Sequence, residues 1–170
     1  MKLPLAAAAA LCLALPAFAH AADKEIVRVY SKPDAPIASL TLVPAGSDIA
    51  FVAGTTPGQP GQPAPVGTEA QTLDVLTKID ALLKAQGMTM GDVVMMRVFL
   101  AVDPDKGGHA DRAGMNAAFK TFFGTPEQPN RPARTTVAIT DGAPGRFVEI
   151  DAMAAKPAKP AMAHHHKKKG

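Results

Sequence analysis

TEAQTLDVLTKIDALLKAQG, residues 68–87, is followed closely by DVVMMRVFLAV, residues 92–102, and this pair of segments decides the fold class. Apolar side chains recur at helical spacing through the first segment: Leu73, Val75, Leu76, Ile79, Leu82 and Leu83. Thr68 and Gln71 match a capping box that would begin this helix, and Gly87 suits its C-terminal cap. The second segment is almost continuously apolar and rich in β-branched residues, which predicts a central strand.

Further elements are predicted on both sides of this pair. The predicted strands are 26–30, 39–43, 49–53, 133–140 and 146–154, and a second helix covers 109–123. Residues 58–67 are dense in Gly and Pro, which predicts a mobile loop. The order is therefore three strands, a helix, a strand, a helix and two strands. It predicts an α+β domain with a single sheet of about six strands and two helices on one face.

The N-terminal segment has the features of an export signal. Lys2 is followed by an apolar run, and Ala19 and Ala21 have the spacing that signal peptidase accepts. We expect cleavage after Ala21, with Ala19 as the alternative, so residues 1–21 and the lone Cys12 would be lost. The mature protein would then be periplasmic or secreted, with no membrane partner. A buried N-terminal helix is the alternative interpretation.

The C-terminal segment KPAKPAMAHHHKKKG, residues 156–170, is predicted to be a disordered Lys/His-rich tail. The whole chain has 18 basic and 15 acidic residues, but residues 22–155 contain only 12 basic residues against all 15 acidic ones. This folded part is therefore mildly acidic, which argues against nucleic acid as a partner. The three histidines of the tail could bind a divalent metal weakly, but a solvated tail without a specific ligand is favoured, so no metal site is predicted.

The last two predicted strands contain the residues that could carry chemistry. Strand alternation predicts that Arg134 lies on the sheet face away from the helices, together with Glu149 and Asp151. An arginine there could hold a carboxylate through two hydrogen bonds, and a glutamate could orient or activate water. The alternative interpretation is a cross-strand ion pair. No Ser/His/Asp set and no glycine-rich phosphate-binding motif occurs in the sequence.

Several segments in order resemble the Rid (YjgF) family of small enamine/imine deaminases, over roughly residues 39–154. These segments are VAGTTP (52–57), residues 68–87 and 92–102 quoted above, MNAAFKTFFG (115–124), RPARTTVAI (131–139) and FVEIDAMA (147–154). The resemblance implies that residues 22–155 form one Rid-like domain with a chorismate mutase-like fold. It also implies a homotrimer with three clefts between the subunits.

The resemblance further implies roles for individual residues. Arg134 would hold the carboxylate of a 2-imino or 2-enamino acid, and Glu149 would position the attacking water. The other substrate-binding positions would be Asn116, Ala53, Gly54 and Thr136. Such enzymes need no cofactor, and they release a 2-keto acid and ammonia.

Four positions depart from the pattern of active Rid deaminases. Ala53 stands where serine is usual, and Thr55 where glutamine is frequent. Ile37 occupies the place of a tyrosine that closes the cleft in that family, and Thr136 that of a cysteine. These departures leave two functions open for the cleft: a divergent deaminase, or a protein that binds a small carboxylate there without turnover. A third alternative is a holdase-like surface protein or metal scavenger that acts through the C-terminal tail.

Overall fold

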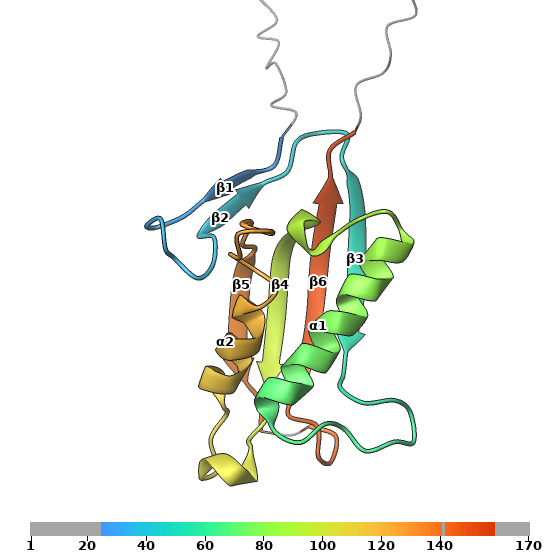
Figure 1. Ribbon diagram of the computed structural model, residues 1–170, viewed down its shortest axis with the longest axis vertical. Helices are drawn as coiled ribbons and strands as arrows, with labels where there is room; N and C mark the ends of the chain where they lie inside the picture. Colours follow the sequence, from blue (N-terminus) through green and yellow to red (C-terminus); the bar gives the residue numbers. More distant parts are fainter. Residues whose placement is uncertain (1–24, 141, 159–170) are drawn as a thin grey trace, which may run out of the picture.

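The computed structural model describes residues 25–140 and 142–158 (Figure 1). The strands are β1 (Val27–Val29), β2 (Leu40–Leu42), β3 (Asp48–Thr55), β4 (Val93–Leu100), β5 (Ala133–Ala138) and β6 (Val148–Lys156). The helices are α1 (Thr68–Ala85) and α2 (Arg112–Lys120), with short 3-10 turns at η1 (Met90–Asp92) and η2 (Pro104–Lys106). The predicted α+β class and element order are confirmed. The predicted export signal and the tail beyond residue 158 lie outside the described residues.

The six strands form two sheets where a single sheet was predicted. A four-stranded sheet has the order β3-β6-β4-β5, and β1 pairs with β2 in a separate ribbon at one end of it (Figure 1). An isolated parallel bridge between Ala38 and Ala133 links them, and so does Thr41 of β2, whose hydroxyl donates to the Val94 carbonyl of β4 at 3.2 Å. Pro36 and Pro132 have no N–H to donate beside this bridge, so the ladder does not extend past it toward the N-terminal side. On the other side, Ser39 donates to Val29 and the chain enters β2.

Both helices pack on the same face of the four-stranded sheet (Figure 1). The core between these layers consists mainly of Val75, Leu76, Ile79 and Leu83 of α1, Met115 and Phe119 of α2, Met96, Val98 and Leu100 of β4, and Val148, Ile150 and Ala152 of β6. The opposite face of the sheet is open and partly apolar. It exposes Ile49, Phe51, Val137 and Met153, with Phe51 at 74% of its maximum area.

The predicted capping box of α1 does not form. Gly67, at φ 82°, is the N-cap residue, and the Thr68 hydroxyl donates to the buried Asp103 at 3.0 Å. Gln71 is only 1% exposed and bonds elsewhere. Its Nε2 donates to the carbonyl oxygens of Pro65 (2.9 Å) and Gly145 (2.8 Å), and its Oε1 accepts from the N–H of Phe147 (2.7 Å). Because Gln71 is buried, its amide needs hydrogen-bond partners inside the fold, and these tertiary partners outcompete the local cap.

The other end of α1 follows the prediction. Gly87 has φ 69° and donates to Lys84, while Met88 donates to Leu83, which together form a Schellman motif. Lys156, which was predicted to begin the tail, instead ends β6 opposite Asp48, and its Nζ donates to the carbonyl of Gly87.

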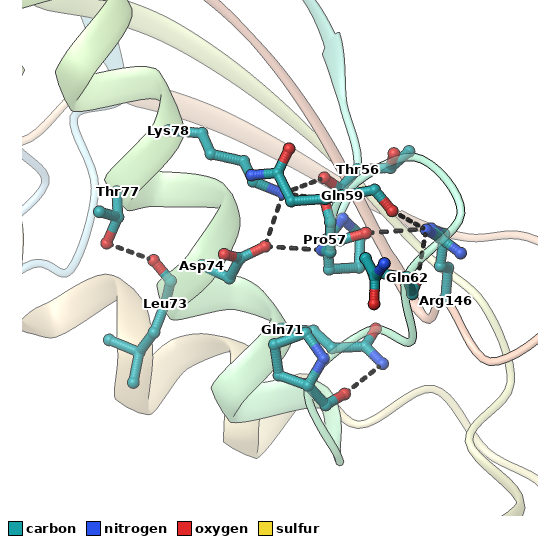
Figure 2. A network of polar contacts seen from close by, with 12 residues as sticks. Thr56, Pro57, Gln59, Gln62, Gln71, Leu73, Asp74, Thr77, Lys78 and Arg146 are labelled. Atoms are coloured by element: carbon teal, nitrogen blue, oxygen red, sulfur yellow. Dashed lines mark hydrogen bonds and ion pairs between the residues drawn. The ribbon is translucent and has the colours of Figure 1, made fainter.

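Polar contacts hold the loop between β3 and α1, which was predicted to be mobile (Figure 2). Arg146 donates from Nε to the Pro57 carbonyl at 3.0 Å and from Nη2 to the carbonyls of Gln59 and Gln62. From α1, Asp74 accepts from the N–H of Gly58 at 2.8 Å. Lys78 pairs with Asp74 at 2.7 Å and donates to the Thr56 carbonyl.

Within the described residues, no helix is both long and apolar enough to cross a bilayer.

Candidate functional site

Arg134 and Glu149 lie on opposite faces of the sheet, so the prediction that they share the face away from the helices is wrong. In the parallel ladder Arg134 pairs with Met96, which is fully buried in the core beneath the helices. In the antiparallel ladder Glu149 pairs with Phe99, whose neighbours Val98 and Leu100 point into the core. Paired residues share a face and neighbours alternate, so Arg134 faces the helices and Glu149 faces away.

Arg134 belongs to a group of residues on β5 and α2 that we call the arginine cluster: Arg134, Asn116, Phe119 and Thr136. The guanidinium carbon of Arg134 lies 4.3 Å from the centre of the Phe119 ring. Its Nη2 donates to Asn116 Oδ1 at 2.8 Å, and its Nη1 lies 3.4 Å from the sulfur of Met115. The predicted neighbourhood of Arg134 and Asn116 is therefore present.

The electrostatics of this cluster favour an anion. Burial lowers the pKa of Arg134 from its usual value, and the charge of Arg112 lowers it further, yet an arginine in a protein remains protonated. Across residues 25–140 and 142–158, no carboxylate lies within ion-pair distance of Arg134. Thr136 follows on the same face of β5, and its buried hydroxyl has no hydrogen-bond partner in this part of the chain. The Arg134 guanidinium, which has unused N–H donors, and the unpartnered Thr136 hydroxyl therefore lie on the same face of β5.

A second group, the glutamate cluster, consists of Ala53, Gly54 and Glu149. The Glu149 carboxylate lies directly against the backbone of Gly54, where an added Cβ would come within 2.0 Å of Oε1. This close approach occurs at a register shift between Val52 and Thr55, where β3 bulges against β6. Glu149 is exposed, with its carboxylate in position to contact water or a ligand.

The open sheet face beside this cluster is hollowed. Ala53 and Gly54 line a groove of about 540 Å³, together with Phe51, Val52, Met95, Arg97, Asp151, Ala152 and Met153. Glu149 itself lines a smaller cavity of about 70 Å³ with Phe99, Arg146 and other residues. A larger groove of about 670 Å³ lies between the start of α1 and α2, but none of the predicted site residues lines it. We therefore base the candidate site on the two clusters.

The cross-strand ion pair considered for Arg134 is formed by a different arginine. Arg97 of β4 donates from Nε to Asp151 of β6 at 2.9 Å. This hydrogen bond and the charge of Asp151 raise the pKa of Arg97. Asp151 is therefore already paired, and Arg134 is left available for a ligand.

Two contributions to the site were missed at the level of sequence. Phe119 packs against the Arg134 guanidinium. The sequence could have indicated this contact, because Asn116 and Phe119 are three residues apart and therefore share one helical face. The contact of Gly54 with Glu149 joins strands about 100 residues apart in sequence, and hydrophobic periodicity cannot predict contacts between distant segments. Within the described residues, no three His, Cys, Asp or Glu side chains gather where they could hold a metal ion.

Comparison with known proteins gives these clusters a context. The family model described as Endoribonuclease L-PSP matches residues 32–156, which include every residue of both clusters. The chain belongs to this family, also known as the Rid or YjgF family. A RutC family protein of Pyrococcus horikoshii is 29% identical over 135 residues, which are 78% of this chain and 98% of the relative.

Solved structures agree with membership of the Rid family. TdcF of E. coli, solved with bound serine, is 26% identical with a TM-score of 0.54, and the match covers 76% of this chain and 99% of TdcF. A Rid family protein from Yersinia pestis has a TM-score of 0.61 at 21% identity, with 78% of this chain and 98% of that one covered. This second likeness supports the fold alone.

Ile37 packs against the core. It occupies the position at which the Rid resemblance implies a tyrosine.

Proposed function

We propose that this chain is a Rid-type hydrolase that converts 2-imino or 2-enamino acids into 2-keto acids and ammonia. The arginine cluster carries the proposal. Arg134 is stacked on Phe119, oriented by Asn116 and unpaired with any carboxylate of the described residues. A guanidinium in this state binds the carboxylate of a small ligand through two parallel hydrogen bonds. The serine bound to the related TdcF has such an α-carboxylate, which supports this assignment.

The complete site needs a second copy of the chain. Because Arg134 and Glu149 lie on opposite faces of the sheet, one chain cannot bring them together. In a homotrimer packed through the open sheet face, the glutamate cluster of one subunit would approach the arginine cluster of the next, giving three equivalent clefts. The exposed apolar side chains of that face support its burial in such an assembly.

The chemistry follows from these placements. Arg134 holds the carboxylate next to the C=N bond, and Glu149 accepts a hydrogen bond from a water molecule and orients its oxygen toward the imine carbon. The water oxygen bonds to that carbon while Glu149 takes one of the water protons, and the C=N π electrons move to nitrogen, which takes up a proton. The resulting aminol collapses to C=O and expels ammonia, with no net change in oxidation state and no cofactor. An enamine first takes a proton at carbon to become the imine.

The family name raises RNA cleavage as another activity. Residues 22–155 are acidic overall, with 12 basic residues against 15 acidic ones, and so repel a polyanion. We therefore propose a small 2-imino or 2-keto acid as the partner, and no nucleic acid. The features of residues 1–21 support a periplasmic or secreted location.

The proposal is tested by following keto acid and ammonia release from 2-iminobutanoate that an amino-acid oxidase generates in situ. Wild-type protein should exceed the uncatalysed rate, and light scattering should give the mass of a trimer. If the rate equals background but 2-ketobutanoate still raises the melting temperature in an Arg134-dependent manner, the chain is the non-catalytic binding protein. The replacement of serine by Ala53 is the observation that favours this second candidate.

Glu149→Gln is expected to reduce kcat by about 100-fold, since loss of a positioned general base typically has an effect of this size. The amide cannot take up a proton from water, whereas the arginine cluster is unchanged. Binding of 2-ketobutanoate, measured by calorimetry, should therefore stay within a few-fold of wild type. An unchanged kcat would show that Glu149 does not act on the water.

Gly54→Ala is expected to reduce kcat by tenfold or more while the domain stays folded. The new methyl group would occupy the place of the Glu149 carboxylate, which must then rotate away from its position. Asp48→Ala is the matched control, because it introduces alanine at an exposed position at the other end of β3. Steady-state kinetics and urea unfolding of both variants check the expectation, and equal kcat for both would contradict it.

A further inference from the structure

Arg112 is a second unpaired arginine beside the arginine cluster, and its position is unfavourable for the fold. It is the first residue of α2, where the partial positive charge of the helix end disfavours a cation. The neighbouring acid, Asp111, is already used as the N-cap that accepts from Gly114 and as a partner of Lys106. Among the described residues, Arg112 takes part in no ion pair. No charge partner among the described residues therefore accounts for its place at the helix start.

Arg112 also acts on Arg134. Its positive charge is the second cause, after burial, of the lowered pKa of Arg134. Two guanidinium groups close enough to interact repel each other, and this cost falls only when an anion lies near both. Arrangements of this kind are typical of binding sites for negatively charged ligands.

The contact of Arg112 with β5 shows how far along the strand its charge is placed. Its Nη1 donates to the carbonyl of Thr136 at 3.4 Å, at the outer edge of the sheet. Thr136 lies two residues beyond Arg134 on β5, a backbone separation of roughly 7 Å. A ligand with two anionic groups joined by a short carbon chain can contact both guanidinium groups, whereas a single carboxylate is held by Arg134 alone. The unpartnered hydroxyl of Thr136 belongs to the same residue whose carbonyl Arg112 contacts.

We propose that Arg112 binds a second anionic group, so that the preferred ligands are 2-imino dicarboxylic acids of four or five carbons. The α-carboxylate binds Arg134 and the distal carboxylate binds Arg112, whose side chain belongs to an exposed residue. This inference rests on the proposed function, because it names the substrate class of the same site.

The test compares two substrates that differ only at the distal end: 2-iminoglutarate and 2-iminopentanoate, each generated in situ by an amino-acid oxidase. Wild-type kcat/KM should be at least tenfold higher for the dicarboxylate. Arg112→Leu should lose this preference and leave kcat/KM for 2-iminopentanoate within about twofold. Lys120→Leu, at the other end of α2 and also exposed, should keep the preference. Arg112→Leu should also melt no lower than wild type, because a cation leaves the helix start.

A binding measurement separates failure of this inference from failure of the proposed function. Calorimetry with 2-ketoglutarate and 2-ketopentanoate needs no turnover. If no imine is hydrolysed but 2-ketoglutarate binds at least tenfold more tightly in an Arg112-dependent manner, the proposed reaction fails and the dicarboxylate site stands. If turnover or binding shows no dicarboxylate preference, or if Arg112→Leu weakens both ligands equally, the dicarboxylate site is overturned.

Discussion

Arg134→Ala is expected to lower kcat/KM for a 2-imino acid by about 100-fold or more. The variant removes both donors to the carboxylate, and losing a charge-assisted pair costs about 3 kcal/mol or more, where each 1.4 kcal/mol corresponds to a factor of ten. It also leaves the Phe119 ring and the Asn116 amide without their partner. Steady-state kinetics with 2-iminobutanoate measure the loss.

Two further variants make this result specific to Arg134. Arg134→Lys keeps the charge but not the planar fork, so an intermediate loss is expected. Lys120→Ala removes an exposed cation from the same helix and should leave kcat/KM unchanged. Wild-type rates in Arg134→Ala, with catalysis clearly above background, would show that the substrate carboxylate binds elsewhere.

Gln71→Leu is expected to lower the free energy of unfolding by about 3 to 5 kcal/mol, the largest stability effect we anticipate. Leucine fits the space but makes none of the three hydrogen bonds of the amide, and it leaves the N–H of Phe147 and the carbonyls of Pro65 and Gly145 unpaired. Gly145 is exposed and can bond water instead, but the groups of the half-buried Pro65 and Phe147 would each cost about 1 to 3 kcal/mol when left unsatisfied. Urea unfolding followed by circular dichroism measures the change.

Gln86→Leu is the matched control for this variant. Gln86 is exposed at the C-terminal end of the same helix, and its replacement should change the unfolding free energy by less than about 0.5 kcal/mol. A change below 1 kcal/mol in Gln71→Leu would mean that water replaces the lost contacts, and that Gln71 does not fasten the loop before α1 to the start of β6.

The order of helices and strands was predictable because each long element has a strong period. The buried stripe of α1 has helical spacing and β4 is a short continuous apolar run, so the secondary structure of each segment can be assigned from its pattern. The details at Thr68 and Gln71 were not predictable, since a local cap motif competes with partners that are distant in sequence. Local pattern alone cannot rank these two kinds of hydrogen bond.

The face of Arg134 was mispredicted for an instructive reason. Val137 is the most apolar residue of β5, so binary patterning assigns the sheet face that carries Val137 to the core. In the structure Val137 lies on the open face beside other exposed apolar side chains, while Arg134 faces α2. Hydrophobicity marks a face that will be buried, but it does not tell burial under a helix from burial under another subunit. On β6 the same rule works, because Val148 and Ile150 are buried in the core.

The position of β6 has a consequence for how the chain folds. β6, the last strand along the described residues, is inserted between β3 and β4, and Asp48 pairs with Lys156 near the far end of the domain. Because its partners in β3 are about 100 residues away in sequence, this ladder can form only after a large loss of chain entropy, which the stabilising contacts offset afterwards. The domain therefore cannot complete its sheet until residues 148–156 are available. A chain that stops short of them has two exposed strand edges, which are the surfaces through which incomplete β proteins aggregate.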